Sequence, residues 1–354
     1  MKSKIMKWSF LFVIVCLSNC VDQPQNNVDS KVGDQTETIE SMVGKNIGEI
    51  KTTDPELNYL MDSTSKVEII GEGYNWAEGP VWVKSEEFLL FSDVPENTIY
   101  KWKEVEGVSK YLSPSGFTGS SQRGGETGSN GLLIDAEGSL VLCQHGDRRI
   151  ARMKSKISTP QSEFQTIADT YKGQKFNSPN DAAFHENGDL FFTDPPYGLQ
   201  KNMNDPLKEI PFQGVYQVTR NGDVVLVTDQ LSRPNGIAFL DRYNLFVANS
   251  DSNHPVIQSF KIDKDGRAID NGVFFDFTEF LGGGRKGSPD GLKVGKGGYI
   301  FATGPGGLHV LTPKGKHLGY VSVDVPISNC AIDASEEHIY MTADMYLLRL
   351  KFKD

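Results

Sequence analysis

The chain has 354 residues, of which 38% are hydrophobic, and this content is sufficient for a large globular core. Its formal net charge of -10 disfavours a nucleic-acid partner, because contact with phosphates requires a basic face. The same negative charge fits poorly with binding to an anionic membrane surface. Length alone allows one domain or two.

The first twenty residues resemble a bacterial lipoprotein signal. Three lysines form a basic start, and the apolar run 8–17 is too short to span a bilayer. The segment ends at Cys20, the position that carries the lipid in such signals, although Asn19 is larger than the residues usual before that cysteine. A plain secretory peptide is the alternative. We expect an exported protein, in the lipoprotein case a periplasmic or cell-surface one, held to a membrane only by a lipid anchor at Cys20.

Residues 21–65 are polar and acidic, with few aromatic side chains. Such a composition buries too little apolar surface to repay the entropy of ordering, so we expect a flexible tether. The tether would hold the folded body, residues 66–354, away from a membrane.

A short polar motif recurs about every fifty residues through this body. Its copies open at six residues, which are Glu78, Asn130, Asn180, Asn235, Asp290 and Asn329. Each opening residue precedes an apolar run, such as 132–134 or 237–239. A fixed period of this length indicates a repeat architecture. Because the repeat fills nearly all of the body, it favours one domain over two.

Within each unit the sequence predicts four strands joined by turns. In the unit that opens at Asn180, the turns Asn187-Gly188 and Asn221-Gly222 each lie between runs of β-branched or aromatic residues, the strongest local hairpin signal. Four-stranded units at this period predict an all-β fold, a six-bladed β-propeller with four-stranded blades. We expect 67–70 to supply the outer strand of the last blade and close the ring, which removes exposed sheet edges.

The six opening residues form a candidate binding site. The first strand of each propeller blade lines the central channel, so these residues should ring one mouth. Carboxylate and amide oxygens are the ligands that hard divalent cations prefer, so Glu78 and Asp290 with the amides suit Ca²⁺, Mg²⁺ or Mn²⁺. The alternative is that the motifs are turns whose side chains cap backbone groups. Asn130 and Asn329 fit that turn role best, although Asn130 is also a candidate substrate contact.

The body contains two cysteines, Cys143 and Cys330, which lie in different repeats. We expect two buried free thiols, although a disulfide is conceivable in an oxidising compartment. The sequence has no Cys-x-x-Cys pair or histidine-rich box of the kind that forms a Cys/His zinc site.

Five motifs resemble those of the gluconolactonase group of the senescence marker protein family, which includes regucalcin. In chain order they are Glu78-Gly79-Pro80-Val81-Trp82, Asn177-Ser178-Pro179-Asn180-Asp181, Asp194-Pro195-Pro196-Tyr197-Gly198, Arg233-Pro234-Asn235-Gly236 and Ser288-Pro289-Asp290-Gly291. The resemblance covers roughly residues 66–354. It implies a six-bladed propeller that opens a sugar lactone to the aldonic acid. It also implies one divalent metal ion, with Ca²⁺ the first expectation and Mg²⁺, Mn²⁺ or Zn²⁺ the alternatives.

Matched residue by residue, the resemblance implies that Glu78, Asn235 and Asp290 are metal ligands. Asn180 matches a residue that contacts substrate and can lie near the metal. Asp290 also matches the acidic residue proposed as general base, which would take a proton from the attacking water. The chain has no Gly-x-Ser-x-Gly elbow, so a serine hydrolase route has no supporting motif.

The stretch 144–149 resembles a feature of the bacterial gluconolactonase branch. His145 follows a predicted strand and could reach the channel mouth, where a neutral imidazole could accept or relay a proton. The alternative is a histidine satisfied within a loop. The chain departs from the animal members at Ser178, where they carry a basic substrate contact. Arg149 or Arg148 is the candidate replacement, and a surface salt bridge is the alternative for Arg149.

Two other functions remain open at this stage, because a propeller fold alone does not prove catalysis. One is a non-catalytic propeller that binds a sugar. The other is a lactonase or esterase that acts on a non-sugar lactone. Turnover of any lactone would distinguish an enzyme from a sugar-binding propeller. The polarity of the pocket would distinguish an enzyme for sugar lactones from one for non-sugar lactones. The sequence does not indicate an oligomeric state.

Overall fold

The computed structural model describes residues 40–121 and 123–353. The predicted signal at 1–20, the anchor at Cys20 and the part of the tether before residue 40 lie outside these residues. The chain divides into two compact units, Met1–Ser41 and Met42–Asp354, and every element below belongs to the second. Within the described residues, no helix is long and apolar enough to cross a membrane.

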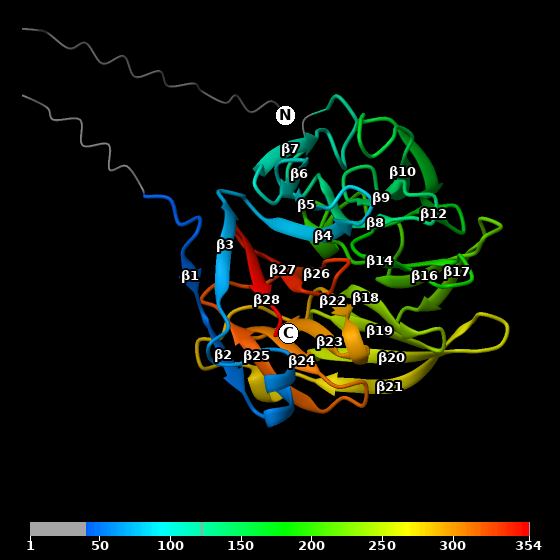
Figure 1. Cartoon of the computed structure of the whole chain (residues 1–354). Helices are drawn as coiled ribbons and strands as arrows, with labels where there is room; N and C mark the ends of the chain where they lie inside the picture. Colours follow the sequence, from blue (N-terminus) through cyan, green and yellow to red (C-terminus); the bar gives the residue numbers. More distant parts are fainter. Residues whose placement is uncertain (1–39, 122, 354) are drawn as a thin grey trace, which may run out of the picture. The chain divides into compact units, whose positions relative to one another are not determined.

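The second unit forms six antiparallel sheets, which are the blades of a β-propeller, and the innermost strands gather around one channel (Figure 1). Blade 1 contains β4 (Ala77–Val83), β5 (Phe88–Asp93), β6 (Thr98–Lys103) and β7 (Gly107–Leu112). Blade 2 contains β8 (Ser129–Ile134), β9 (Leu140–Gln144), β10 (Arg149–Met153) and β11 (Phe164–Ala168). Blade 3 contains β14 (Ala182–Phe184), β15 (Leu190–Asp194), β16 (Gly214–Val218) and β17 (Val224–Thr228).

Blade 4 contains β18 (Pro234–Asp241), β19 (Asn244–Asn249), β20 (Val256–Ile262) and β21 (Ala268–Asp276). Blade 5 contains β22 (Leu292–Val294), β23 (Ile300–Gly304), β24 (Gly307–Leu311), β25 (His317–Ser322) and β2 (Glu49–Thr52). Blade 6 contains β26 (Asn329–Ile332), β27 (His338–Ala343), β28 (Tyr346–Lys351), β3 (Val67–Glu72) and β1 (Asn46–Ile47). The remaining elements are the hairpin β12 (Thr170–Tyr171) and β13 (Gln174–Lys175), and the short 3-10 helices η1 (Pro55–Tyr59), η2 (Asn202–Asn204), η3 (Thr278–Phe280) and η4 (Lys296–Gly298).

The ring is closed by a strand from the beginning of the body. β3 pairs antiparallel with β28, so that Val67 faces Leu350 and Glu72 faces Tyr346. The last blade therefore takes three strands from the end of the chain and its fourth from the start, as predicted. This pairing leaves no open gap between the first and last blades.

The folded unit begins before the boundary expected at residue 66. β1 pairs with β3, and β2 pairs with β25, so each adds a fifth strand to one blade. The tether predicted for 21–65 is wrong over this part, because the polar composition of 46–52 does not prevent it from forming β1 and β2. A strand at the edge of a sheet needs few apolar side chains, because its backbone forms hydrogen bonds with the neighbouring strand. Ile50, Leu57 and Met61 are enough to anchor the segment, and all three are buried.

The core lies between the blades rather than inside them. Every residue of β5 is buried, because successive side chains point to opposite faces and a neighbouring blade covers each face. Phe88 and Leu90 pack with the second blade, whereas Leu89 and Phe91 pack with the sixth. This arrangement explains why the inner strands read as apolar runs.

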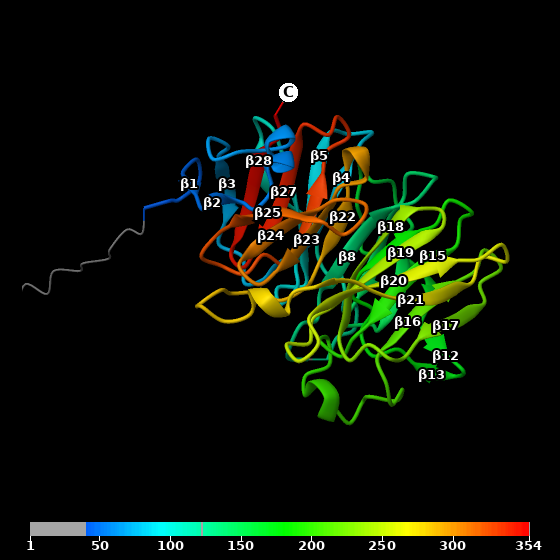
Figure 2. The same cartoon turned by 90° about the horizontal axis from the view of Figure 1, so that it is seen from below.

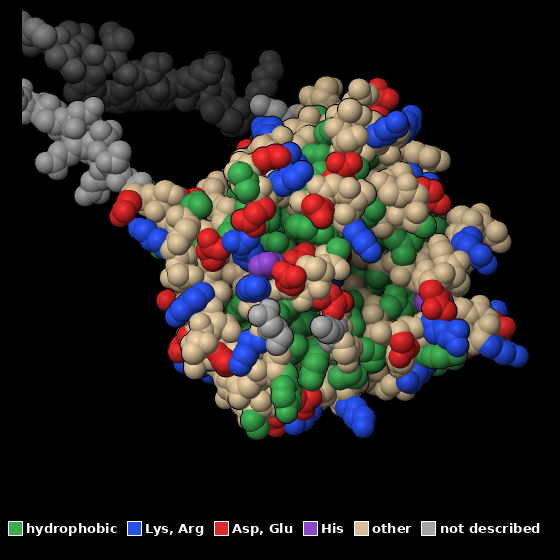
Figure 3. All heavy atoms as spheres, viewed as in Figure 1, with side chains coloured by type: hydrophobic (Ala, Val, Ile, Leu, Met, Phe, Trp, Pro, Cys, Tyr) green, Lys and Arg blue, Asp and Glu red, His purple; other side chains and the backbone are tan. Residues whose placement is uncertain are grey.

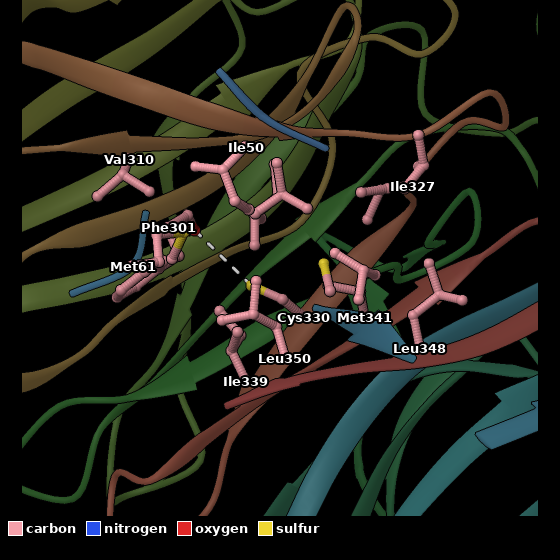
Figure 4. Packing of buried hydrophobic residues seen from close by; sticks show 14 of the residues in the cluster. Ile50, Met61, Phe301, Val310, Ile327, Cys330, Ile339, Met341, Leu348 and Leu350 are labelled. Carbon is pink, nitrogen blue, oxygen red and sulfur yellow. Dashed lines mark hydrogen bonds between the residues drawn. The ribbon is translucent and has the colours of Figure 1, made fainter. Parts of the chain in front are cut away.

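Figure 4 shows one such cluster, in which Ile50 and Met61 meet residues of blades 5 and 6. Cys330 lies in it, and its Sγ is 3.7 Å from the carbonyl oxygen of Phe301. Cys143 and Cys330 are both buried and free, as the sequence analysis predicts.

The two faces of the propeller differ in what projects from them. In Figure 2 the chain ends at one face, whereas the hairpin β12–β13 lies toward the other. We call the mouth of the channel near the opening residues of the motifs the front mouth. The opposite mouth, where the innermost strands end, is the rear mouth.

Candidate functional site

The repeated motif marks the start of the innermost strand of each blade. Glu78, Asn130, Asn235 and Asn329 lie within the first two residues of their strands, and Asn180 and Asp290 lie two residues before theirs. Register shifts follow the motif in three blades, between Glu78 and Val81 for example. The motif is thus a strand entry rather than a tight turn.

The glycine of the motif is required for close approach between blades. An added Cβ at Gly131 would lie 2.7 Å from the carbonyl oxygen of Asn180, and one at Gly236 would lie 2.2 Å from that of Asp290. The same glycines donate their backbone N–H to these oxygens, at 2.7 and 3.0 Å. Neighbouring motifs are therefore bonded to each other through their backbones, which brings their side chains to one mouth.

Hydroxyl groups of the second strands bond further carbonyls of the motif. Ser92 Oγ donates to Asn130 O at 2.9 Å, and Thr193 Oγ1 donates to Asn235 O at 2.7 Å. The carbonyl groups of these two motif copies are thus bonded by the preceding blade. Their side chains are not needed as caps, which removes much of the physical basis for the turn-only interpretation.

A cavity of about 270 Å³ lies at the front mouth and is lined by side chains from several blades. The lining residues are Trp76, Glu78, Glu126, Asn130, Asn180, Tyr197, Arg233, Asn235, Ser250, Ser288 and Asp290. Five of the six opening residues meet here. Asn130, which fitted a turn role best by pattern, is one of them.

The sixth opening residue turns away from this cavity. Asn329 Oδ1 accepts from the backbone N–H of Cys330 at 2.8 Å, and its Nδ2 donates to Asp181 Oδ2 at 3.3 Å. Asn329 therefore belongs to a second layer of polar side chains behind the cavity, together with Asp181 and Lys293, whose ammonium is 3.5 Å from Asp181 Oδ2.

Two carboxyl groups of the cavity, those of Glu78 and Asp290, form no ion pair with the described residues. Burial raises the pKa of Glu78 to about 8, with further upward contributions from the charges of Asp181 and Glu126 and a partial offset from the N–H of Gly79. Burial also raises the pKa of Asp290 well above its ordinary value, and the nearby charge of Glu78 adds to this effect. The two groups repel each other when both are ionised.

Unpartnered oxygen atoms face the same space. Asp290 Oδ1 and Asn130 Oδ1 are buried and have no hydrogen-bond donor. Asn235 Nδ2 donates to Ser250 Oγ at 3.0 Å, which leaves its Oδ1 as the atom available to a ligand. Such acceptors, beside two repelling carboxyls, fit a hard divalent cation. Among the described residues, no three or more His, Cys, Asp or Glu side chains are grouped so as to hold a metal, so amide oxygens would have to complete the set.

His145 does not line the cavity. Its ring is fully buried, and neither ring nitrogen has a hydrogen-bond partner. Nδ1 lies 3.5 Å from Glu126 Oε2, and Glu126 itself lines the cavity. His145 is therefore one side chain removed from the site.

Arg149 and Arg148 are engaged elsewhere. Arg149 donates to Gln144 Oε1 at 2.6 Å, to Asp147 Oδ2 at 2.9 Å and to a threonine hydroxyl of the same blade. Arg148 donates to the carbonyl oxygen of Phe176 at 2.6 Å. Neither guanidinium lines the cavity, so the structure does not bring these predicted substrate contacts to the other site residues.

The cation of the cavity is instead Arg233, whose guanidinium lies 5.8 Å from the ring centre of Tyr197. The sequence motif contains Arg233, but its pattern assigns no role to it. Glu126 was also missed, because it lies in an irregular segment between blades 1 and 2 that carries no periodic signal.

Ser178, where the chain departs from the animal pattern, has a structural task. Its Oγ donates to the carbonyl oxygen of Pro195 at 2.6 Å and accepts from the N–H of Gly198 at 2.9 Å. Asp194 accepts from the N–H groups of Asn177 and Ser178, both at 2.8 Å. Burial raises the pKa of Asp194 to about 7. These bonds hold the segment that presents Tyr197.

Comparison with known proteins matches residues 76–344 to the model of the SMP-30/Gluconolactonase/LRE-like region. The chain is 36% identical over 319 residues to the gluconolactonase of Zymomonas mobilis subsp. mobilis, covering 88% of each. A putative gluconolactonase of known structure superposes with a TM-score of 0.74 at 29% identity, covering 86% of this chain and 98% of that one. A gluconolactonase from Xanthomonas campestris shares the fold, with a TM-score of 0.74 at 24% identity over 89% and 99% of the two chains.

Proposed function

From the premise that this chain belongs to the SMP-30/gluconolactonase/LRE-like family, we propose that it is a metal-dependent hydrolase that opens a sugar lactone to the aldonic acid. The observation that carries the proposal is the front cavity. It combines two buried carboxyls, three amide side chains and one arginine in a space of about 270 Å³. This lining is polar enough for a polyhydroxylated ring.

Glu78, Asn180, Asn235 and Asp290 would hold the cation, with Ca²⁺ favoured because every donor is an oxygen. Mg²⁺, Mn²⁺ and Zn²⁺ remain alternatives for the same set. When bound, the cation would supply polarisation of the lactone carbonyl and of the attacking water. It would also stabilise the ionised forms of Glu78 and Asp290, because their mutual repulsion would be offset.

Asp290 is the candidate general base. Its Oδ1 has no donor from the protein and lies on the cavity that the lactone would enter. It would take a proton from water as the water oxygen bonds to the lactone carbonyl carbon. The ester C–O bond then breaks, and the proton passes to the departing ring oxygen. The products are one carboxyl group and one hydroxyl group on the opened chain.

His145 would act through Glu126 rather than on the substrate. Its Nδ1 is 3.5 Å from Glu126 Oε2, so the imidazole is placed to position that carboxylate at the edge of the cavity. This role replaces direct proton transfer, for which His145 is one side chain too distant.

Arg233 and Tyr197 would orient the substrate. The guanidinium offers several donors to sugar hydroxyls or to the carboxylate of the product. Asn130 and Asn180 add amide groups that can bond further hydroxyls. Arg149 is not needed for this role, because Arg233 already supplies a cation inside the cavity.

A lactone panel tests the proposal. The chain is freed of metal with a chelator and assayed with glucono-1,5-lactone and with a non-sugar lactone, before and after Ca²⁺ is restored. We expect turnover of the sugar lactone only with the metal, and loss of turnover in Glu78→Gln. Turnover that persists without metal would remove the metal from the proposal. Binding of the lactone without turnover would instead support a sugar-binding propeller.

A further inference from the structure

The rear mouth of the channel opens into a second cavity, of about 450 Å³. It is lined by the apolar runs that follow each motif, and it shares Ile134, Phe184 and Phe239 with an adjoining surface groove. Figure 3 views this face, and hydrophobic side chains line the hollow near its centre. The volume falls in the range of small-molecule sites, which are mostly apolar and carry few polar groups.

One polar side chain reaches this apolar cavity. Among the described residues that line it, only Lys293 is not hydrophobic. Lys293 lies at the middle position of β22, and 29% of its side chain is exposed. Its ammonium nitrogen is near the front end of the cavity, because it contacts Asp181 Oδ2 and Asn329 Oδ1, each at 3.5 Å.

The ammonium of Lys293 has donor capacity to spare. Both contacts are at the outer limit of hydrogen bonding, and an ammonium has three N–H groups. Asp181 depends little on Lys293, because its Oδ1 accepts from the N–H of Ala182 at 2.9 Å and its Oδ2 also accepts from Asn329. Both acceptors lie 3.5 Å from the ammonium nitrogen, so a closer acceptor bound in the cavity would give this charged donor a stronger hydrogen bond than either.

We propose that the rear cavity binds a hydrophobic monocarboxylate, with its carboxylate on Lys293 and its alkyl or aryl body against the apolar walls. Trp82, Phe184 and Phe239 supply aromatic wall surface. A monoanion fits better than a phosphate, because a single ammonium serves the site and the carboxylate of Asp181 lies beside it. A sugar fits poorly, because the walls offer it no hydrogen bonds.

The rear cavity is separate from the front site. The motif glycines bring the innermost strands together between the two mouths, and Asp181, Lys293 and Asn329 fill the remaining space with polar side chains. The proposal therefore does not depend on lactone hydrolysis. A ligand at the rear mouth should bind whether or not the front site holds metal or substrate.

Calorimetric titration of the full chain with decanoate tests the proposal, with decanol as the neutral probe of equal length. We expect one decanoate per chain. Lys293→Met should weaken binding by about tenfold or more, since a hydrogen bond to a charged group contributes roughly that factor. Lys84→Met is the matched control, because Lys84 is exposed near the same face but does not line the cavity. It should bind decanoate as the unaltered chain does.

Two additions keep the result interpretable. Lys293→Met removes the ion-pair partner of Asp181 and so could disturb the fold. The double variant Lys293→Met with Asp181→Asn replaces both charges by neutral groups of similar shape. It should also lose decanoate binding. A brominated decanoate should quench Trp82 fluorescence, and Trp82→Phe should remove that quenching. The proposal is overturned if decanoate does not bind, or if decanol binds equally well. It is also overturned if Lys293→Met, alone and combined with Asp181→Asn, binds decanoate as the unaltered chain does, or if the quenching survives Trp82→Phe.

Discussion

The two mouths lie at opposite ends of the innermost strands, yet they have opposite chemistry. At the front mouth, Glu78 and Asp290 bring carboxyl groups into a small polar cavity. At the rear mouth, only a few residues further along each strand, the lining is hydrophobic apart from Lys293. The propeller fold therefore fixes where side chains converge, whereas the position of a residue along its strand decides the chemistry of the mouth that it lines.

The largest effect is expected where the front mouth loses its charge. Asp290→Asn should lower kcat for glucono-1,5-lactone by about 10³-fold, because the variant loses both the base and a candidate ligand. The fold should survive, since the change removes one of two repelling buried carboxyls. Steady-state kinetics and thermal unfolding measure the two effects. Near-normal turnover would take Asp290 out of the catalytic role.

The boundary between the mouths depends on the motif glycines. Gly236→Ala would place Cβ 2.2 Å from the carbonyl oxygen of Asp290, a backbone atom that cannot move aside cheaply. We expect a loss of about 3 kcal/mol in the free energy of unfolding, measured by denaturant titration.

Gly222→Asn is the matched control for Gly236→Ala. Gly222 lies in a turn with φ of +87° and open space around it, and asparagine tolerates this region better than other residues. Its effect should be small. Equal stability of Gly236→Ala and the unaltered chain would show that the blades do not need this close approach.

A pair of arginine variants distinguishes the cavity from its surroundings. Arg233→Gln should raise KM for the lactone by about tenfold, because the one cation of the cavity is lost. Arg149→Gln should leave KM within about twofold, since that guanidinium is bonded within blade 2. Michaelis kinetics on the two variants decide the point. The reverse order of effects would restore Arg149 as the substrate contact.

A further effect is expected in the pH dependence of the stability of the metal-free chain. The folded-state pKa of Glu78, about 8, exceeds its ordinary value of 4.5, so the folded state binds the proton more tightly. The stabilisation from this proton is complete below pH 4.5 and is lost as the pH rises through 8. In chelator, the melting temperature of Glu78→Gln should therefore fall less over this range. Identical pH profiles would contradict the raised pKa.

Much of the architecture could be predicted because its signals are local and repeated. The motif at Asn180 and its five relatives, with the Asn-Gly turns, gave the blades, and the segment 67–70 closes the ring as expected. The tether boundary was wrong because strand pairing on a sheet edge leaves almost no mark in composition. Ile50 and Leu57 are too few to produce an apolar pattern.

Within the candidate site, the sequence predicted the residues that belong to the repeated motif, and five of its six opening residues line the cavity. Asn235 and Asp290 converge because the same entry into the innermost strand recurs in each blade. Glu126 lies in an irregular segment, and Arg233 lies just before β18. The repeat does not determine where either side chain points, although both line the cavity. Arg149 is the opposite case, because Gln144 and Asp147 bond its guanidinium within blade 2, and the sequence pattern does not show these contacts.

We propose that the front mouth holds one divalent cation between Glu78 and Asp290. Calorimetric titration of the chelator-treated full chain with Ca²⁺ tests it most directly, and Glu78→Gln combined with Asp290→Asn serves as the comparison. We expect one Ca²⁺ per chain in the unaltered protein and no binding in the double variant. Equal binding by both proteins, or no binding by the unaltered chain while it still opens the lactone, would contradict it.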